Sequence, residues 1–314
     1  MDTLTTYQDG IHAVDSGFGR PRLNAVHLIV EAGRAAIIDS ANYEAVPRVL
    51  AALAHLGIGV EDVDYMIVTH VHLDHAGGAS RLLTHLPHAS LVVHPRGARH
   101  MTDPTRLIAG TREVYGAAAA ARMYGDILPV PPERVIETHH GMALPLGQRR
   151  LSFLDTPGHA RHHHCIVDSR SGHIFAGDTF GLSYRELDRG GRCFVFPSTT
   201  PVQFDPPALH RSIDLLAGHD PGAIYVTHYS QVVDIPRLAD DLHRQVEALA
   251  NAALQARGAA DRPSRLVAAV AELVRQEAQS QGWAVQGEAL MQFLRMDIEL
   301  NAQGLGAWLD TLEA

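Results

Sequence analysis

The run THVHLDHAGG, from Thr69 to Gly78, places three histidines and one aspartate within six consecutive positions. Imidazole and carboxylate are the ligands that zinc and related divalent metals use in hydrolytic sites. An apolar segment at 63–68 precedes the run and predicts a buried strand, and a helix-like stretch follows its two glycines. A loop at a strand end directs neighbouring side chains in different directions, so the run predicts a metal site with room for two ions.

Three further candidate ligands, His159, Asp178 and His228, also follow short apolar runs. The runs are LSFL at 151–154, which leads through DTPG to His159, HIFAG at 173–177 and AIYVT at 223–227. Active sites often gather at the edge of a sheet, where strands end and loops begin. The sequence therefore predicts that these three side chains share an edge with the first run.

A short internal similarity relates two parts of the chain. The segment 35–39, which ends in Asp39, resembles the approach to Asp178, and the segment 65–70 resembles 224–228. The order of a strand with Asp, then a strand with Thr-His, thus occurs twice. We interpret this as two similar halves whose strand ends face one another across a cleft.

Taken together, these motifs resemble the motif series of the metallo-β-lactamase-fold hydrolases. The matching residues occur in the family's order over the first three quarters of the chain and are Asp39, His70, His72, Asp74, His75, His159, Asp178 and His228. The resemblance implies an α/β (α+β) fold, a four-layer αβ/βα sandwich with a dinuclear metal site between two sheets.

The resemblance also assigns a role to each motif residue. It implies that the first metal is held by His70, His72 and His159. It implies that the second is held by Asp74, His75 and His228. Asp178 would bridge the two ions, and Asp39 would orient the ligands. We expect two divalent ions, zinc first, with Mn²⁺ or Fe²⁺ as alternatives.

Departures from individual branches of the family narrow the expected function. Asp178 and His75 stand where common zinc β-lactamases carry cysteine and often arginine, which favours the branch of glyoxalase II, lactonases and esterases. His72 stands where the flavodiiron branch has glutamate. Lactonases of acylated homoserine lactones place a tyrosine where this chain has Gly181, and Tyr184 lies three residues further on.

The expected reaction is hydrolysis of an ester, lactone or thioester bond in a small molecule. The metal lowers the pKa of its water from about 15.7 to about 7, so hydroxide is available near neutral pH. Asp74 is the candidate catalytic residue, since it would combine metal ligation with steering the attacking proton. Two alternatives stay open: phosphodiester hydrolysis at the same site, and a mononuclear iron dioxygenase acting on glutathione persulfide.

Length and periodicity predict the domain organisation. At 314 residues the chain accommodates one large domain plus an appendage. We predict a catalytic domain over 1–235 with a helical insertion at about 96–132, followed by a helical extension over 236–314. The broad apolar face of the extension favours a homodimer.

Composition restricts partners and compartment. The formal charge of −9 argues against a nucleic-acid surface, and no apolar segment reaches the roughly 20 residues of a membrane span. The chain contains no lysine, which excludes Schiff-base chemistry. Residues 1–6 lack the basic start and apolar core of a signal peptide, and Cys165 and Cys193 are spaced unlike a metal or redox pair. We therefore expect a cytoplasmic protein with two free thiols and a small-molecule substrate.

Two other features are open to two interpretations. The histidines at 162–164 are expected to straddle both faces of a following strand, one orienting a neighbour and the others solvated, rather than to bind metal. The aromatic stretch 180–197 either lines the site or packs as an ordinary loop. Lining would favour a substrate with an apolar portion.

Overall fold

The computed structural model describes residues 3–199 and 201–313. The chain divides into two compact units that interleave along the sequence. Unit 1 comprises Met1–Asp155, His162–Gly177 and Thr227–Ser230, and unit 2 comprises Thr156–Arg161, Asp178–Val226 and Gln231–Ala314. The division into a domain of 1–235 and an extension of 236–314 stays a prediction.

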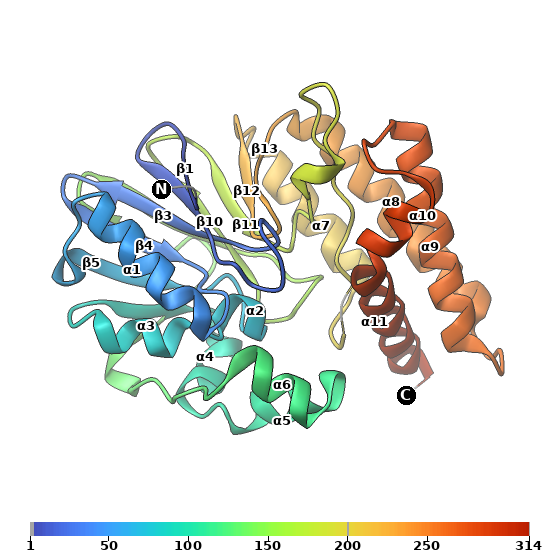
Figure 1. Ribbon diagram of the computed structural model, residues 1–314, viewed down its shortest axis with the longest axis horizontal. Helices are drawn as coiled ribbons and strands as arrows, with labels where there is room; N and C mark the ends of the chain where they lie inside the picture. Colours follow the sequence, from blue (N-terminus) through green and yellow to red (C-terminus); the bar gives the residue numbers. More distant parts are fainter. Residues whose placement is uncertain (1–2, 200, 314) are drawn as a thin grey trace. The chain divides into compact units, whose positions relative to one another are not determined.

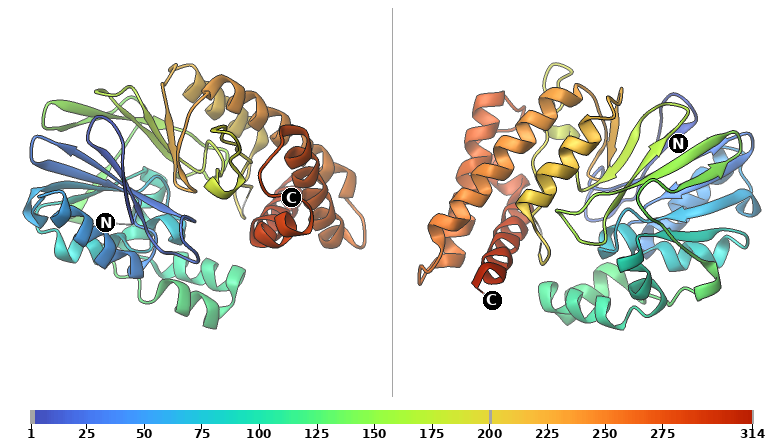
Figure 2. Two further views of the ribbon diagram at one scale, coloured as in Figure 1. Left: turned by 45° about the horizontal axis from the view of Figure 1, so that its top comes forward. Right: turned by 180° about the vertical axis from the view of Figure 1, so that it is seen from behind.

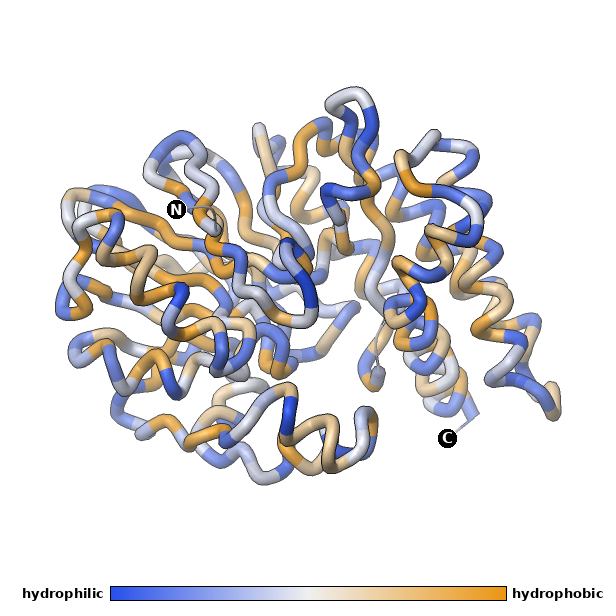
Figure 3. Tube along the Cα trace, viewed as in Figure 1, coloured by the Kyte–Doolittle hydropathy of each residue, from blue (hydrophilic) through white to orange (hydrophobic). Residues whose placement is uncertain are grey.

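Unit 1 contains a seven-stranded sheet whose strands follow one another in chain order. They are β1 (Leu4–Thr6), β2 (Ile11–Asp15), β3 (Ala25–Glu31), β4 (Arg34–Ile38), β5 (Val63–Ile67), β6 (Ser90–Val93) and β7 (Val135–Glu137). Strands β1 to β4 pair antiparallel, and β4 to β7 pair parallel. Strands β3 and β4 consist mostly of hydrophobic residues (orange in Figure 3), as expected for strands buried on both faces.

Parallel strands require crossover connections, and this unit supplies them mainly as helices (Figure 1). The helices are α1 (Val46–His55), α2 (Leu73–Ala76), α3 (Ala79–His85), α4 (Pro95–Thr102), α5 (Thr105–Tyr115) and α6 (Ala117–Tyr124), with 3-10 turns at Tyr43–Ala45, Val60–Asp62 and Pro132–Arg134. Helices α4 to α6 span Pro95–Tyr124 and overlap the stretch of about 96–132 that the sequence predicts to be a helical insertion.

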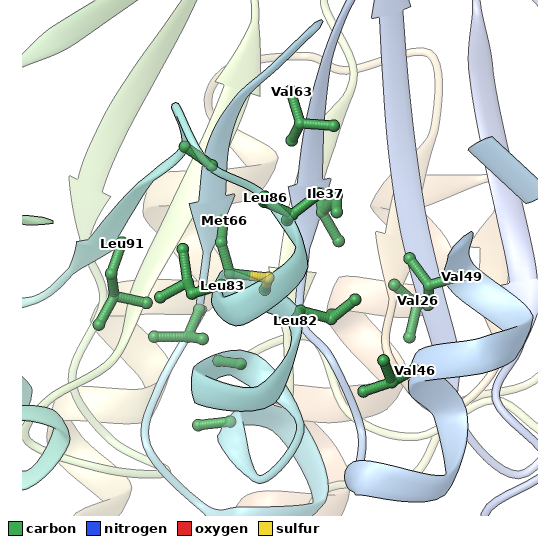
Figure 4. Close-up of a cluster of buried hydrophobic side chains, with 14 of the residues drawn as sticks. Val26, Ile37, Val46, Val49, Val63, Met66, Leu82, Leu83, Leu86 and Leu91 are labelled. Atoms are coloured by element: carbon green, nitrogen blue, oxygen red, sulfur yellow. The ribbon is translucent and has the colours of Figure 1, made fainter. Parts of the chain in front are cut away.

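Helices α1 and α3 bury their apolar sides against the seven-stranded sheet. Val49 of α1 lies near Val26 of β3, and Leu82 of α3 lies near Ile37 and Met66 of β4 and β5 (Figure 4). All five side chains are fully buried. Truncating a buried leucine to alanine typically lowers the free energy of unfolding by about 2–5 kcal/mol. This packing therefore stabilises strands β4 and β5, whose ends carry the loops that follow them.

Four further strands of unit 1 pair antiparallel in chain order: β8 (Ala143–Leu146), β9 (Arg149–Asp155), β10 (His164–Asp168) and β11 (Ile174–Gly177). A buried ion-pair network joins them to the seven-stranded sheet. The Arg149 guanidinium on β9 donates to Glu31 on β3 at 2.9 and 3.1 Å and to Asp168 on β10 at 3.1 Å. Each buried charge in this network has a partner of opposite sign, which compensates the free-energy cost of removing the charge from water.

Unit 2 consists mainly of helices, together with the strand β12 (Ile224–Val226) and a 3-10 turn at Arg185–Leu187; β13 (Ser230–Val232) crosses from unit 1 into unit 2. The helices are α7 (Pro206–Ala217), α8 (Ile235–Ala256), α9 (Arg262–Gln281), α10 (Gly287–Phe293) and α11 (Arg295–Glu313). Helices α8, α9 and α11 pack side by side (Figure 2). None of the described helices is long and apolar enough to cross a membrane.

Sequence periodicity accounts for the packing of α8. Leu238, Leu242, Val246 and Leu249 recur at three- and four-residue steps and are all at most 5% exposed. The mixed and antiparallel sheets, the flanking helices and the C-terminal helices agree with the predicted α/β (α+β) class.

Candidate metal centre

Every predicted ligand follows the end of a strand, as the sequence indicates. Strand β5 ends two residues before Thr69, β9 ends at Asp155 before the turn to His159, β11 ends immediately before Asp178, and β12 ends two residues before His228. Backbone at a strand end leaves the sheet and can turn its side chains toward a common point. The two units contribute different members of the set.

Five of the predicted ligands come together in unit 1: His70, His72, Asp74, His75 and His228. Nε2 of His70 lies 3.0 Å from Nδ1 of His72, and the rings of His70 and His75 are 4.0 Å apart. The Oδ2 atom of Asp74 lies 3.2 Å from Nε2 of His228 and 3.5 Å from Nε2 of His75.

Asp74, His75 and His228 have the spacing of a metal-binding triad. One donor atom from each lies within 4.8 Å of the other two. Ligand atoms around a tetrahedral zinc with bonds of about 2.0–2.1 Å are about 3.3 Å apart. The two distances from the Asp74 oxygen bracket that value, so two nitrogens and one oxygen fit a borderline divalent metal.

The loop that carries these residues is fixed by close backbone packing. The hydroxyl of Ser40 donates to the carbonyl of His75 at 2.7 Å, and the amide of Gly78 donates to the carbonyl of Ala41 at 2.9 Å. A Cβ atom on Gly78 would lie 2.6 and 2.7 Å from the carbonyl oxygens of Asn42 and Ser40. The glycine therefore allows the motif loop to lie directly against the loop after β4.

Asp39 is the buried centre of a hydrogen-bond network beneath the histidines. Its Oδ1 accepts from the amide of Thr69 at 2.8 Å, and its Oδ2 accepts from Nδ1 of His75 at 2.8 Å and from Oγ1 of Thr227 at 2.7 Å. Carboxylates accept only, so His75 must carry its proton on Nδ1. The lone pair of Nε2 is thereby directed toward Asp74, the arrangement in which an imidazole binds metal.

The internal similarity in the sequence reappears in this network. Thr69 and Thr227 occupy equivalent places in the two Thr-His segments, and both hydroxyls donate to Asp39, at 3.0 and 2.7 Å. Asp39 also has φ 58°, in the left-handed region that residues other than glycine rarely adopt, although aspartate and asparagine tolerate it better than most. The carboxylate is thus held by both similar segments.

Unit 2 contributes His159 and Asp178, which lie with Nε2 and Oδ2 3.7 Å apart. Nδ1 of His159 donates to the carbonyl of Ser198 at 3.1 Å, which leaves Nε2 on the side of Asp178. Gly158 has φ +137°, and a Cβ there would lie 2.4 Å from Cα of Leu209, so only glycine allows this turn to pack on α7. That the two groups of ligands join into one centre stays a prediction.

The consecutive histidines at 162–164 correct one expectation. All three are buried, with His163 at 0% and His164 at 1% exposed, so none is solvated. The rings of His163 and His70 are 4.9 Å apart, and Nδ1 of His162 accepts from the amide of Val71 at 3.5 Å. Burial lowers the pKa of His164 to about 3. Their position between the candidate ligand His159 and the apolar residues of β10 was the available signal for burial.

The aromatic stretch 180–197 packs against the C-terminal helices of unit 2. Rings of Phe194 and Phe196 lie 5.9 and 6.2 Å from that of the buried Trp283. The hydroxyl of Tyr184 donates to Asp297 of α11 at 2.9 Å. The ordinary packing interpretation therefore describes these side chains. Both cysteines are free and buried, as predicted.

Comparisons with known proteins identify the family. The profile of the metallo-beta-lactamase superfamily matches residues 19–228. ST1585 of Sulfurisphaera tokodaii, a metallo-beta-lactamase fold-containing protein, is 26% identical over 62% of this chain and 68% of its own. A hydroxyacylglutathione hydrolase of Aeromonas hydrophila is 28% identical over 65% of this chain and 61% of its own.

Solved structures agree on the fold. The archaeal ST1585 structure has a TM-score of 0.65 at 21% identity and covers 96% of this chain and 99% of its own. TTHA1429 of Thermus thermophilus, a metallo-beta-lactamase family protein, has a TM-score of 0.67 at 20% identity and covers 97% of this chain and 94% of its own. The predicted fold is confirmed, and the chain belongs to the metallo-beta-lactamase superfamily.

Proposed function

We propose that the protein is a dinuclear metal-dependent hydrolase that cleaves an ester, lactone or thioester bond of a small molecule. The observation that carries the proposal is the Asp74, His75 and His228 triad, with its donor atoms within 4.8 Å of one another. The buried carboxylate of Asp39, 2.8 Å from Nδ1 of His75, supports it because it fixes the tautomer that metal binding needs.

The proposed ligand assignment follows the two groups of residues. One ion would be held by His70, His72 and His159. The other would be held by Asp74, His75 and His228. Asp178 would be shared between them. A donor set of imidazoles and carboxylates without thiolate suits zinc, with manganese or iron as alternatives.

Divalent ions in such a site would make a hydroxide nucleophile available near neutral pH and would polarise the carbonyl under attack. The chain's own residues orient the reaction. The backbone carbonyl of Asp74 accepts from Nδ2 of Asn24 at 2.6 Å, and its side chain is 25% exposed. The hydrogen bond from Asn24 fixes the backbone of Asp74, while its carboxylate remains accessible to solvent. We propose that this carboxylate directs the proton of the attacking water.

The similarity to the hydroxyacylglutathione hydrolase of Aeromonas hydrophila, at 28% identity, supports thioesters as the first substrates to test. Two buried thiols, Cys165 and Cys193, agree with a reducing compartment, so we propose the cytoplasm as the location. The formal charge of −9 supports a small-molecule substrate rather than nucleic acid.

The test is a panel of thioesters, lactones, aryl esters and phosphodiesters, assayed with the wild type and with His159→Ala, Asp178→Ala and the exposed control His219→Ala. We expect one carboxylic-ester class to be turned over. Each ligand variant should lose at least about 100-fold in turnover together with bound metal. The control should keep both. Normal activity in either ligand variant would refute the assignment, and turnover of phosphodiesters alone would refute the substrate class.

A further inference from the structure

A cavity of about 330 Å³ lies within unit 2, between α8, α9, α11 and the turn at 196–197. Its volume is at the lower end of the range for small-molecule sites, roughly 300–1,000 Å³. The floor is apolar and buried: Phe196, Leu249, Val270 and Val274 are at most 8% exposed. None of the predicted metal ligands lines this cavity, so it is a feature in addition to the metal centre.

One buried polar group on the wall has an unused hydrogen-bond donor. Asn301 is 2% exposed, and its Oδ1 accepts from the amide and the hydroxyl of Thr199, at 2.6 and 2.9 Å. The backbone N–H of Thr199 can only donate, so it fixes which end of the side-chain amide is oxygen. Within the described part of the chain, no hydrogen bond uses Nδ2 of Asn301. An acceptor oxygen on a ligand in the cavity would take this hydrogen bond in place of water.

The charged side chains that line the cavity are paired. Arg244 donates to Glu277 at 2.5 and 2.9 Å and to Asp241 at 2.8 Å, and Arg237 donates to Asp241 at 3.0 Å. The two charged residues that line the cavity, Arg244 and Glu277, thus form an ion pair with each other. An anionic ligand would compete with the carboxylates of Glu277 and Asp241 for Arg244, and a cationic ligand would compete with Arg244 for Glu277. The cavity therefore favours an uncharged occupant.

We propose that this cavity, which we call the helical pocket, binds an uncharged and largely apolar small molecule through one hydrogen bond from Asn301 to an acceptor oxygen of the ligand. The floor supplies the apolar contacts, and the pairing of Arg244 with Glu277 disfavours carboxylates and amines as ligands. The volume equals that of about eleven liquid water molecules, which limits the occupant to on the order of ten non-hydrogen atoms.

The test uses three probes with the same number of carbon atoms: octan-2-one, octanoate and octylammonium. Each is titrated into the full chain and followed by ligand-observed NMR and by the shift in thermal unfolding. We expect octan-2-one to bind at least tenfold more tightly than either charged probe. Absence of octan-2-one binding, or tighter binding of a charged probe, would overturn the proposal.

A matched pair of variants locates the binding. Ala248 lines the helical pocket, whereas Ala252, one helical turn further along α8, does not, and both side chains are partly exposed. Ala248→Phe fills the cavity and should weaken octan-2-one binding at least tenfold, and Ala252→Phe should leave it unchanged. Equal affinity in the two variants would place the binding elsewhere and overturn the proposal.

A third variant tests the hydrogen bond. Asn301→Asp keeps an oxygen for Thr199 and removes the N–H donor, so octan-2-one should bind about threefold to tenfold more weakly. Unchanged affinity in a folded Asn301→Asp protein would overturn the role of Asn301. If that variant does not fold, the pair at 248 and 252 still decides the site.

Discussion

Asp39→Asn isolates what the buried carboxylate beneath His75 contributes to metal binding. Asparagine tolerates the left-handed backbone at this position, where φ is 58°, so the substitution changes chemistry more than conformation. The side-chain oxygen of the asparagine can still accept from the amide of Thr69, which lies 2.8 Å from Oδ1 of Asp39 in the wild type. The new amide group, in contrast, faces Nδ1 of His75 or Oγ1 of Thr227, and it can only donate.

The magnitude follows from the tautomer of His75. An amide that donates to Nδ1 forces the imidazole proton onto Nε2, the nitrogen 3.5 Å from Asp74 Oδ2. A protonated Nε2 has no lone pair for a metal. Loss of such a supporting carboxylate typically costs 10- to 100-fold in metal affinity, which corresponds to about 1.4 to 2.7 kcal/mol.

The assay is a competition titration of the metal-free protein with zinc against a chromophoric chelator. We expect the weakest-binding site to lose about 10- to 100-fold in affinity in Asp39→Asn. Asp168→Asn is the matched control, because Asp168 is an equally buried carboxylate of unit 1 whose partners are Arg149 and Ser171. Wild-type zinc affinity in Asp39→Asn, or an equal loss in the control, would refute the reasoning.

Three further predictions concern pH, the motif loop and assembly. Burial lowers the pKa of His27 to about 4 and that of His164 to about 3, so below about pH 6.5 the unfolded chain binds more protons than the folded chain. Each histidine should therefore lower the free energy of unfolding by about 2 kcal/mol at pH 5 relative to the limit at high pH. Denaturant titrations that give equal stability at pH 5 and pH 7.5 would contradict this prediction. Gly78→Ala places a Cβ 2.6 and 2.7 Å from two carbonyl oxygens, so it should destabilise the protein by about 1–3 kcal/mol and weaken metal binding. A thermal midpoint and a zinc affinity equal to those of the wild type would show that the loop shifts to accommodate the methyl group, and would contradict this prediction. Met296 and Leu312 on α11 are 60% and 47% exposed, which supports a homodimer through the helical extension, and a monomer mass by light scattering at micromolar concentration would refute it.

The sequence predicts that the candidate ligands follow strand ends because strand ends have a local signature. The apolar runs before His70, Asp178 and His228 correspond to β5, β11 and β12, which end one to three residues before these candidate ligands. The two similar segments of the sequence also meet at Asp39, since the threonine of each donates to its carboxylate. These features depend on residues adjacent in sequence.

Features that depend on distant contacts were beyond the sequence. The aromatic residues after Asp178 pack on Trp283 and Asp297, about a hundred residues away, and no local pattern separates such packing from a substrate wall. The burial of 162–164 was missed because histidine is amphipathic, and its burial depends on partners such as Val71 from another segment. The helical pocket is likewise formed by segments from 196 to 301.

The most direct test of the proposed metal centre is the metal content of protein purified without chelator or added metal, measured by elemental mass spectrometry together with protein concentration. We predict about two divalent ions per chain, chiefly zinc, falling to about one or fewer in Asp178→Ala. About one iron per chain would contradict the dinuclear hydrolase and favour the dioxygenase alternative. Metal-free protein that retains full hydrolytic activity would refute the metal-dependent mechanism altogether.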